Sequence, residues 1–130
     1  MGAWGHSAFE NDDALDWVAE LEVAADTSIL MASFEAVLGT DKDYIEIPEA
    51  SITISAAEVV AALLGQADPS LPLEVQTWVA GQENVDVKVF EQARSAVNRV
   101  LKDSELKDVW EDSGSDDWKM GVEALLRRLR

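Results

Sequence analysis

The residues that could do chemistry together cluster near the start of this 130-residue chain. His6 is its one histidine, and Trp4 and Glu10 stand within four positions of it. An imidazole titrates near neutral pH, so His6 is the natural general base if the chain has one. Asp13 follows Asn11, which suits a helix N-cap. One hypothesis is therefore a small ligand-binding or metal-binding site, or a hydrolase site, built from Trp4, His6, Glu10 and Asp13.

Packing is the simpler interpretation of the same segment. Trp4 and Phe9 precede the cap and can fold onto the core in the manner of a hydrophobic staple. His6 has no G-x-S-x-G elbow elsewhere in the chain to supply a nucleophile. We therefore favour a chain that is not an enzyme, with no catalytic residue assigned.

Metal and cofactor chemistry find little support in the sequence. One histidine and no cysteine leave zinc without its usual ligands. Asp41–Asp43 begins like a calcium loop, but Glu46 and Ile52 occupy its glycine and glutamate positions. No glycine-rich phosphate loop is present. We expect no cofactor, and only a weak alternative of magnesium held by carboxylates. Those carboxylates would be Glu10, Asp12, Asp13 and Asp16.

Glu58 stands alone in an apolar run of alanine, valine and leucine. A buried carboxylate must be paired, hydrogen-bonded or protonated. We expect either a partner such as Arg94 or Arg99, or exposure on a narrow polar stripe with Ser51 and Ser55. The alternative is a functional carboxylate with a perturbed pKa.

The net charge of −16 belongs to the first two thirds of the chain. Residues 1–87 hold 17 acidic residues and the single base Lys42, whereas residues 88–130 hold nine of each sign. This charge argues against nucleic-acid binding, which needs a basic surface. A solvated acidic face explains it, and so does a field that steers a basic protein partner. The candidate ligand or partner residues are Trp4, His6, Glu10, Asn11, Asp12, Asp13, Asp16 and Glu58.

Apolar periodicity predicts an all-α single domain over residues 1–130, with six or seven helices. At most a very short extended piece lies near Tyr44–Ile47. The first helix would bury Ala14, Trp17, Val18 and Leu21, and the third, apolar all round, would be central. The stripes of two later helices would include Leu73 and Val87. The expected helices are 11–22, 27–38, about 48–64, 72–80, 86–102, one from Ser104, and one capped by Asp116.

Several segments are similar to a known family. MGAWG at 1–5 and FENDDALDW at 9–17 resemble the bacterial domain-of-unknown-function family 4259. Further similar segments run over 46–65, 71–79, 104–113 and 125–129. The resemblance implies a small stand-alone bacterial domain, and it brings no established activity.

These observations favour a non-enzymatic interaction module that binds a basic protein partner in the bacterial cytoplasm. We expect no membrane segment, since no apolar stretch approaches the roughly 20 residues that a span needs. An antidote-like role fits the size and acidity by analogy. The alternatives are the N-terminal ligand or hydrolase site and a DNA mimic. The oligomeric state stays open.

Overall fold

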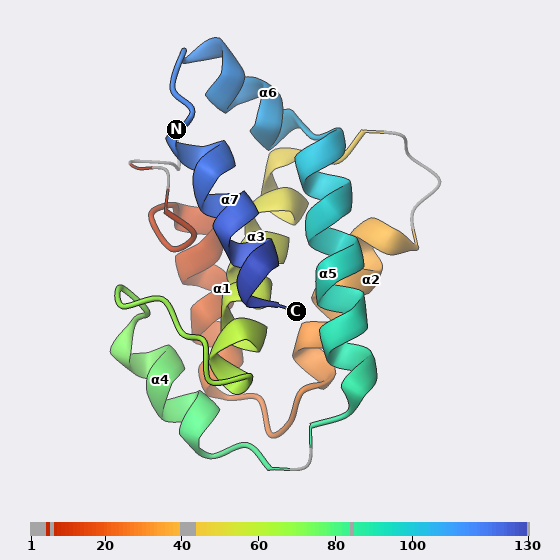
Figure 1. Ribbon diagram of the computed structural model, residues 1–130. Helices are drawn as coiled ribbons and strands as arrows, with labels where there is room; N and C mark the ends of the chain where they lie inside the picture. Colours follow the sequence, from red (N-terminus) through yellow and green to blue (C-terminus); the bar gives the residue numbers. More distant parts are fainter. Residues whose placement is uncertain (1–4, 6, 40–43, 84, 130) are drawn as a thin grey trace.

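The computed structural model describes residues 5, 7–39, 44–83 and 85–129, and these residues form seven α-helices and no strand (Figure 1). An isolated parallel bridge joins Ile45 to Ser104. The all-α prediction is confirmed, and the short extended piece near Tyr44–Ile47 reduces to this bridge. The helices are α1 (Asp12–Glu22), α2 (Ser28–Leu38), α3 (Ile47–Leu63), α4 (Leu73–Ala80), α5 (Val87–Lys102), α6 (Glu105–Asp112) and α7 (Asp117–Arg128).

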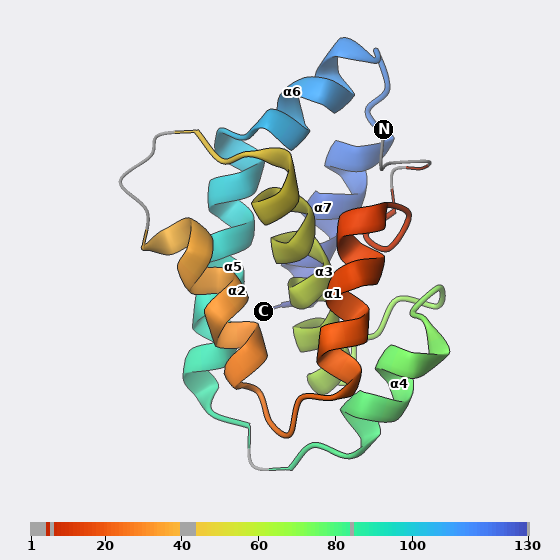
Figure 2. The ribbon, with the colours of Figure 1, turned by 180° about the vertical axis from the view of Figure 1, so that it is seen from behind.

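The central helix is α3, as its apolar sequence predicts. It packs against each of the other described helices. Figures 1 and 2 show α7 on one side of it and α1 and α2 on the opposite side. Val59 and Val60 are fully buried, and even the polar Ser51 and Ser55 are hidden from solvent. Polar side chains buried on such a helix are usually satisfied by internal partners.

Local sequence signals set most of the helix ends. The Asn11 side chain accepts a hydrogen bond from the backbone N–H of Ala14 at 2.8 Å, which satisfies one free donor of α1. Ser104 caps α6 in the same way. Gly65 follows α3 with φ of +80°, a conformation that favours glycine. Asp116 precedes α7 as predicted, but its side chain makes no capping hydrogen bond.

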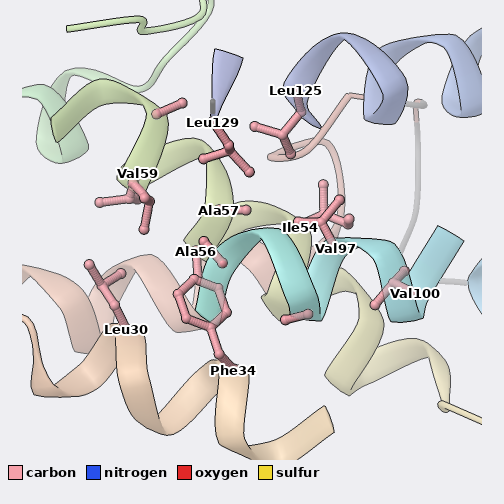
Figure 3. Close-up of a cluster of buried hydrophobic side chains, with 14 of the residues drawn as sticks. Leu30, Phe34, Ile54, Ala56, Ala57, Val59, Val97, Val100, Leu125 and Leu129 are labelled. Carbon is pink, nitrogen blue, oxygen red and sulfur yellow. The ribbon is translucent and has the colours of Figure 1, made fainter. Parts of the chain in front are cut away.

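The core joins the inner faces of the helices. Figure 3 shows Phe34 of α2 pointing toward Ala56 of α3, and Leu30 pointing toward Val59. The predicted inner face of α1 is confirmed in full. Its residues are Ala14, Trp17, Val18 and Leu21.

The predicted stripes of α4 and α5 need a correction at their starts. Leu73 is 71% exposed and Val87 is 64% exposed. Each is the first residue of its helix, and the packed stripe begins two residues later, at Val75 and Val89. No helix among the described residues is both long and apolar enough to cross a bilayer.

Candidate functional site

The N-terminal turn folds onto α3 through its backbone. The Ser55 hydroxyl lies 2.8 Å from the Ala8 carbonyl and 3.0 Å from the Ser51 carbonyl, and its one hydrogen is shared between these two acceptors. The Asn11 side-chain amide also donates to Ala8, at 3.3 Å. Because Ser55 is fully buried, these bonds fix the turn against the middle of α3.

The predicted corner is only partly placed by the structure. Trp4 and His6 lie outside the described residues, so their roles stay predictions. Glu10 folds back over Gly5, and a Cβ on that glycine would run into its carboxylate. Glu10 also accepts a hydrogen bond from the Ser7 backbone N–H at 3.3 Å. The Glu10 side chain therefore stabilises the conformation of the turn.

Beneath this turn lies a cavity of about 210 Å³. It opens between the turn, the middle of α3 and the inner side of α7. Its wall combines aromatic, hydroxyl and charged side chains. The residues that line it include Ser7, Phe9, Glu58, Asp68, Ser70, Trp118, Gly121 and Arg128.

A two-pronged ion pair closes one end of the cavity. Arg128 Nη1 donates to Glu58 Oε1 at 2.8 Å, and Nη2 donates to Oε2 at 2.9 Å. Nη1 also donates to the Gln66 carbonyl at 3.1 Å. The hydrogen bonds with Glu58 raise the pKa of Arg128 above its ordinary value. This parallel geometry is the strong form of a carboxylate–guanidinium contact.

Of the two states left open by the sequence, Glu58 adopts the buried and paired one, but the partner is neither Arg94 nor Arg99. Glu58 is 7% exposed, so it does not lie on a solvated stripe. Arg94 instead donates to the Leu129 carbonyl at 2.7 Å. The Glu58 side of α3 faces α7 and the N-terminal turn, so α7 supplies the cation through Arg128.

A second carboxylate stands at the cavity wall. Asp68 Oδ1 accepts hydrogen bonds from the Ser70 backbone N–H at 2.8 Å and from the Ser70 hydroxyl at 2.6 Å. These bonds lower the pKa of Asp68, which keeps the carboxylate ionised at neutral pH. Two carboxylates and one guanidinium thus line the cavity. The sequence marks residues 68–70 as a turn, but nothing in it relates them to Glu58.

The other predicted carboxylates lie along the outer side of α1. Asp12 and Asp16 are exposed, and Asp13 is partly buried. Within the described part of the chain, no group of three or more acidic, histidine or cysteine side chains could hold a metal ion. Asp12 and Asp16 are exposed while Glu10 folds over Gly5, so Glu10, Asp12, Asp13 and Asp16 form no such group and the magnesium alternative stays a prediction.

The first four helices and the segments beside them carry many exposed acidic side chains. Residues 7–39 and 44–83 contain no lysine or arginine. We call the exposed acids of this part the acidic surface. They are Asp12, Asp16, Glu20, Glu22, Asp26, Glu35, Glu46, Glu49, Glu74 and Glu83.

Fold and site together define a small all-helical domain with a polar cavity under its N-terminal turn and an acidic surface on its first four helices. The family model described as "Domain of unknown function (DUF4259)" matches residues 2–121. The chain belongs to this family, and the predicted resemblance is confirmed, although segment 125–129 lies beyond the matched residues. No curated protein and no solved structure matches the chain.

Proposed function

We propose that this domain is a non-enzymatic interaction module of the bacterial cytoplasm, and that its acidic surface binds a basic protein partner. The observation that carries the proposal is the uncompensated charge of α1. Asp16, Glu20 and Glu22 are exposed and form no ion pair within the described chain. Asp16 and Glu20 stand four residues apart, where like charges repel.

Such a surface is costly for the free domain and favourable for a complex. Like charges without compensating bases raise the free energy of the folded state, and a basic partner would offset that repulsion. Charge complementarity also speeds association and rejects acidic partners. Neutralisation of a basic toxin is one role of this kind, taken from analogy alone.

The test compares two variants that change the charge equally. One carries Asp16→Asn, Glu20→Gln and Glu22→Gln on the acidic surface. The control carries Glu91→Gln, Asp103→Asn and Asp112→Asn, which are exposed positions of the charge-balanced C-terminal third. Tagged proteins would be used to capture partners from host lysate at about 50 mM and about 500 mM salt, since salt screens exposed charges.

We expect wild type and control to capture the same basic protein at low salt only, and the α1 variant to lose it. Capture that ignores both salt and the α1 substitutions would contradict the proposal.

A second candidate function is the binding of a small molecule in the cavity, and Gly121 favours it. This glycine lies within α7, where glycine costs stability relative to alanine. A Cβ placed on it meets nothing within 4 Å, so packing does not require a glycine there. Gly121 is exposed and lines the cavity, so a larger residue there would stand beside the cavity.

The side chains of the cavity wall indicate which class of ligand it would bind. Phe9 and Trp118 offer apolar rings, and the two carboxylates outnumber the single guanidinium. A cavity of about 150 Å³ holds one benzene ring. The cavity here, at about 210 Å³, therefore suits a ring-bearing small amine.

Benzylamine and related ring-bearing amines can be titrated into wild type and into Gly121→Leu, with ligand-observed NMR as the readout. We expect binding to wild type that is lost when the leucine fills the cavity. Equal signals for the two proteins would remove this candidate.

A further inference from the structure

An open groove of about 390 Å³ runs along the side of the molecule that is remote from the cavity. Helices α1 and α2 both pack on α3, and Figure 2 shows them on either side of it. All three helices contribute to the groove wall. Its residues are Trp17 and Glu20 of α1, Ile29, Ala32, Ser33 and Ala36 of α2, and Glu49 and Ile52 of α3.

The groove is apolar where another helix could approach it. Ala32 and Ala36 are exposed and one helical turn apart, so α2 presents small side chains there. Ile29 and Ile52 are partly buried beside them and pack against the core. Apolar side chains from a second molecule would be shielded from water in this groove.

The charged members of the groove wall are both acidic. Glu20 and Glu49 are exposed. The described part of residues 1–83 supplies no basic side chain to neutralise them. A partner segment with lysine or arginine beside its apolar residues would therefore be complementary, and an acidic segment would be repelled.

Trp17 lies in the groove wall and carries a buried polar group without a partner among the described residues. The residue is 3% exposed, and its indole N–H has no hydrogen-bond partner within the described residues. A buried donor without an acceptor is uncommon and destabilising, and it calls for an explanation.

We propose that this groove binds a basic amphipathic helix of the partner protein. Apolar side chains at helical spacing lie along Ala32, Ala36 and Ile52, and flanking lysine or arginine side chains pair with Glu20 and Glu49. This is the helix-in-groove mode of recognition. The inference rests on the proposed function, since it specifies which part of the acidic surface the basic partner occupies.

The probe is a synthetic helical peptide of leucine, alanine and lysine, with leucines at positions i, i+3, i+4 and i+7. A second peptide has the same composition in an order that gives no apolar face. The two peptides carry equal charge, so any difference between them reports the apolar face.

The groove is tested with Ala32→Gln/Ala36→Gln, which fills it without changing charge. The matched control is Ala19→Gln/Ala80→Gln, two exposed helical alanines outside the groove wall. Calorimetric titration should show that the groove variant binds the amphipathic peptide about tenfold more weakly, a loss of about 1.4 kcal/mol. The control should bind it as wild type does.

The indole N–H resonance of Trp17 supplies a readout inside the groove. It can be assigned from the spectrum of Trp17→Phe, which lacks it. We expect the amphipathic peptide to shift this resonance and the reordered peptide to leave it in place.

The outcomes separate this inference from the proposed function. If both peptides bind equally and the groove variant binds like wild type, the groove proposal is overturned while charge-driven binding stands. If neither peptide binds even at low salt, the groove proposal also fails. The lysate capture with the α1 variant then decides the proposed function on its own.

Discussion

The two sides of α3 treat their polar groups in opposite ways. On the cavity side, the Ser55 hydroxyl is hydrogen-bonded to backbone carbonyls, and the Glu58 carboxylate accepts two hydrogen bonds from Arg128. On the groove side, the Trp17 indole N–H has no partner among the described residues. The same holds for the hydroxyl of Thr53, which lies one helical turn from Glu49 on α3.

The buried polar groups on the cavity side therefore have hydrogen-bond partners, whereas those named on the groove side have none among the described residues. Buried polar groups with all partners in place rigidify a structure, whereas unpaired ones cost free energy until something satisfies them. The cavity side therefore holds its shape in the free domain. On the groove side, the unpaired Trp17 and Thr53 groups lower the stability of the domain.

The largest effect should come from breaking the ion pair at the cavity. Arg128→Met leaves the Glu58 carboxylate buried without its cation, and we expect a loss of about 3 kcal/mol in the free energy of unfolding. Urea unfolding at neutral pH measures it. The double variant Glu58→Leu/Arg128→Met should recover to within about 1 kcal/mol of wild type, because it removes the charge as well. A double variant as weak as the single one would mean that Arg128 acts through packing.

The comparison between the two sides of α3 can be made with two single substitutions on that helix. Ser55→Ala removes a satisfied hydroxyl and should cost about 1 kcal/mol. Thr53→Val removes an unsatisfied one of similar size and should stabilise the domain by about 1 kcal/mol. Urea unfolding of both variants gives the signs. If both substitutions destabilise, Thr53 has a partner and the two sides are alike.

Local features of the fold could be predicted from the sequence. The inner face of α1 follows from helical periodicity and from Asn11 as a cap, and both depend only on residues a few positions apart. The burial of α3 follows from the apolar run of its second half, in which Glu58 is the one polar residue between Ala56 and Leu64. The exposed positions of Leu73 and Val87 were missed, because periodicity does not show where along a helix its neighbour begins.

The partner of Glu58 could not be predicted for a related reason. Arg128 lies 70 positions away in the sequence. Which cation reaches Glu58 depends on how α3 is rotated between α5 and α7, and no local pattern encodes that rotation. Arg128 by itself suggested only a favourable charge at a helix end. The roles of Trp4 and His6 stay predictions, as do those of the α1 carboxylates.

A smaller effect should follow from filling the cavity wall at Gly121. Gly121→Ala places a methyl group where the structure has room, inside α7. Alanine is the better helix former, so we expect a gain of roughly 0.8 kcal/mol in the free energy of unfolding. Thermal unfolding by circular dichroism measures it. A loss of stability would show that this wall has no spare room, and the case for a ligand cavity would weaken.

Tyr44 differs from both sides of α3, because its hydroxyl has a hydrogen-bond partner although the residue is exposed. It donates to Asp108 Oδ2 at 2.6 Å, and this bond, with nearby acidic charge, raises the pKa of Tyr44 to about 12. The folded state is stabilised in full below pH 10, and the stabilisation is lost as the pH rises from 10 to about 12. Tyr44 is the one tyrosine, so phenolate absorbance reports it alone. In Asp108→Ala the midpoint should fall toward 10. An unchanged midpoint would assign the shift to the remaining acids.

The smallest change in stability should come from the acidic surface itself. Asp16→Asn and Glu20→Gln remove exposed charges that have no partner within the described chain, so each should change the free energy of unfolding by less than about 0.5 kcal/mol. The sign should be a slight gain, because like charges four residues apart repel. Urea unfolding at low and high salt checks this, since salt should erase the gain. A loss comparable to that of Arg128→Met would make these carboxylates structural. A negligible change in the free energy of unfolding would mean that the fold does not need these carboxylates, and binding would remain as the reason for their charge.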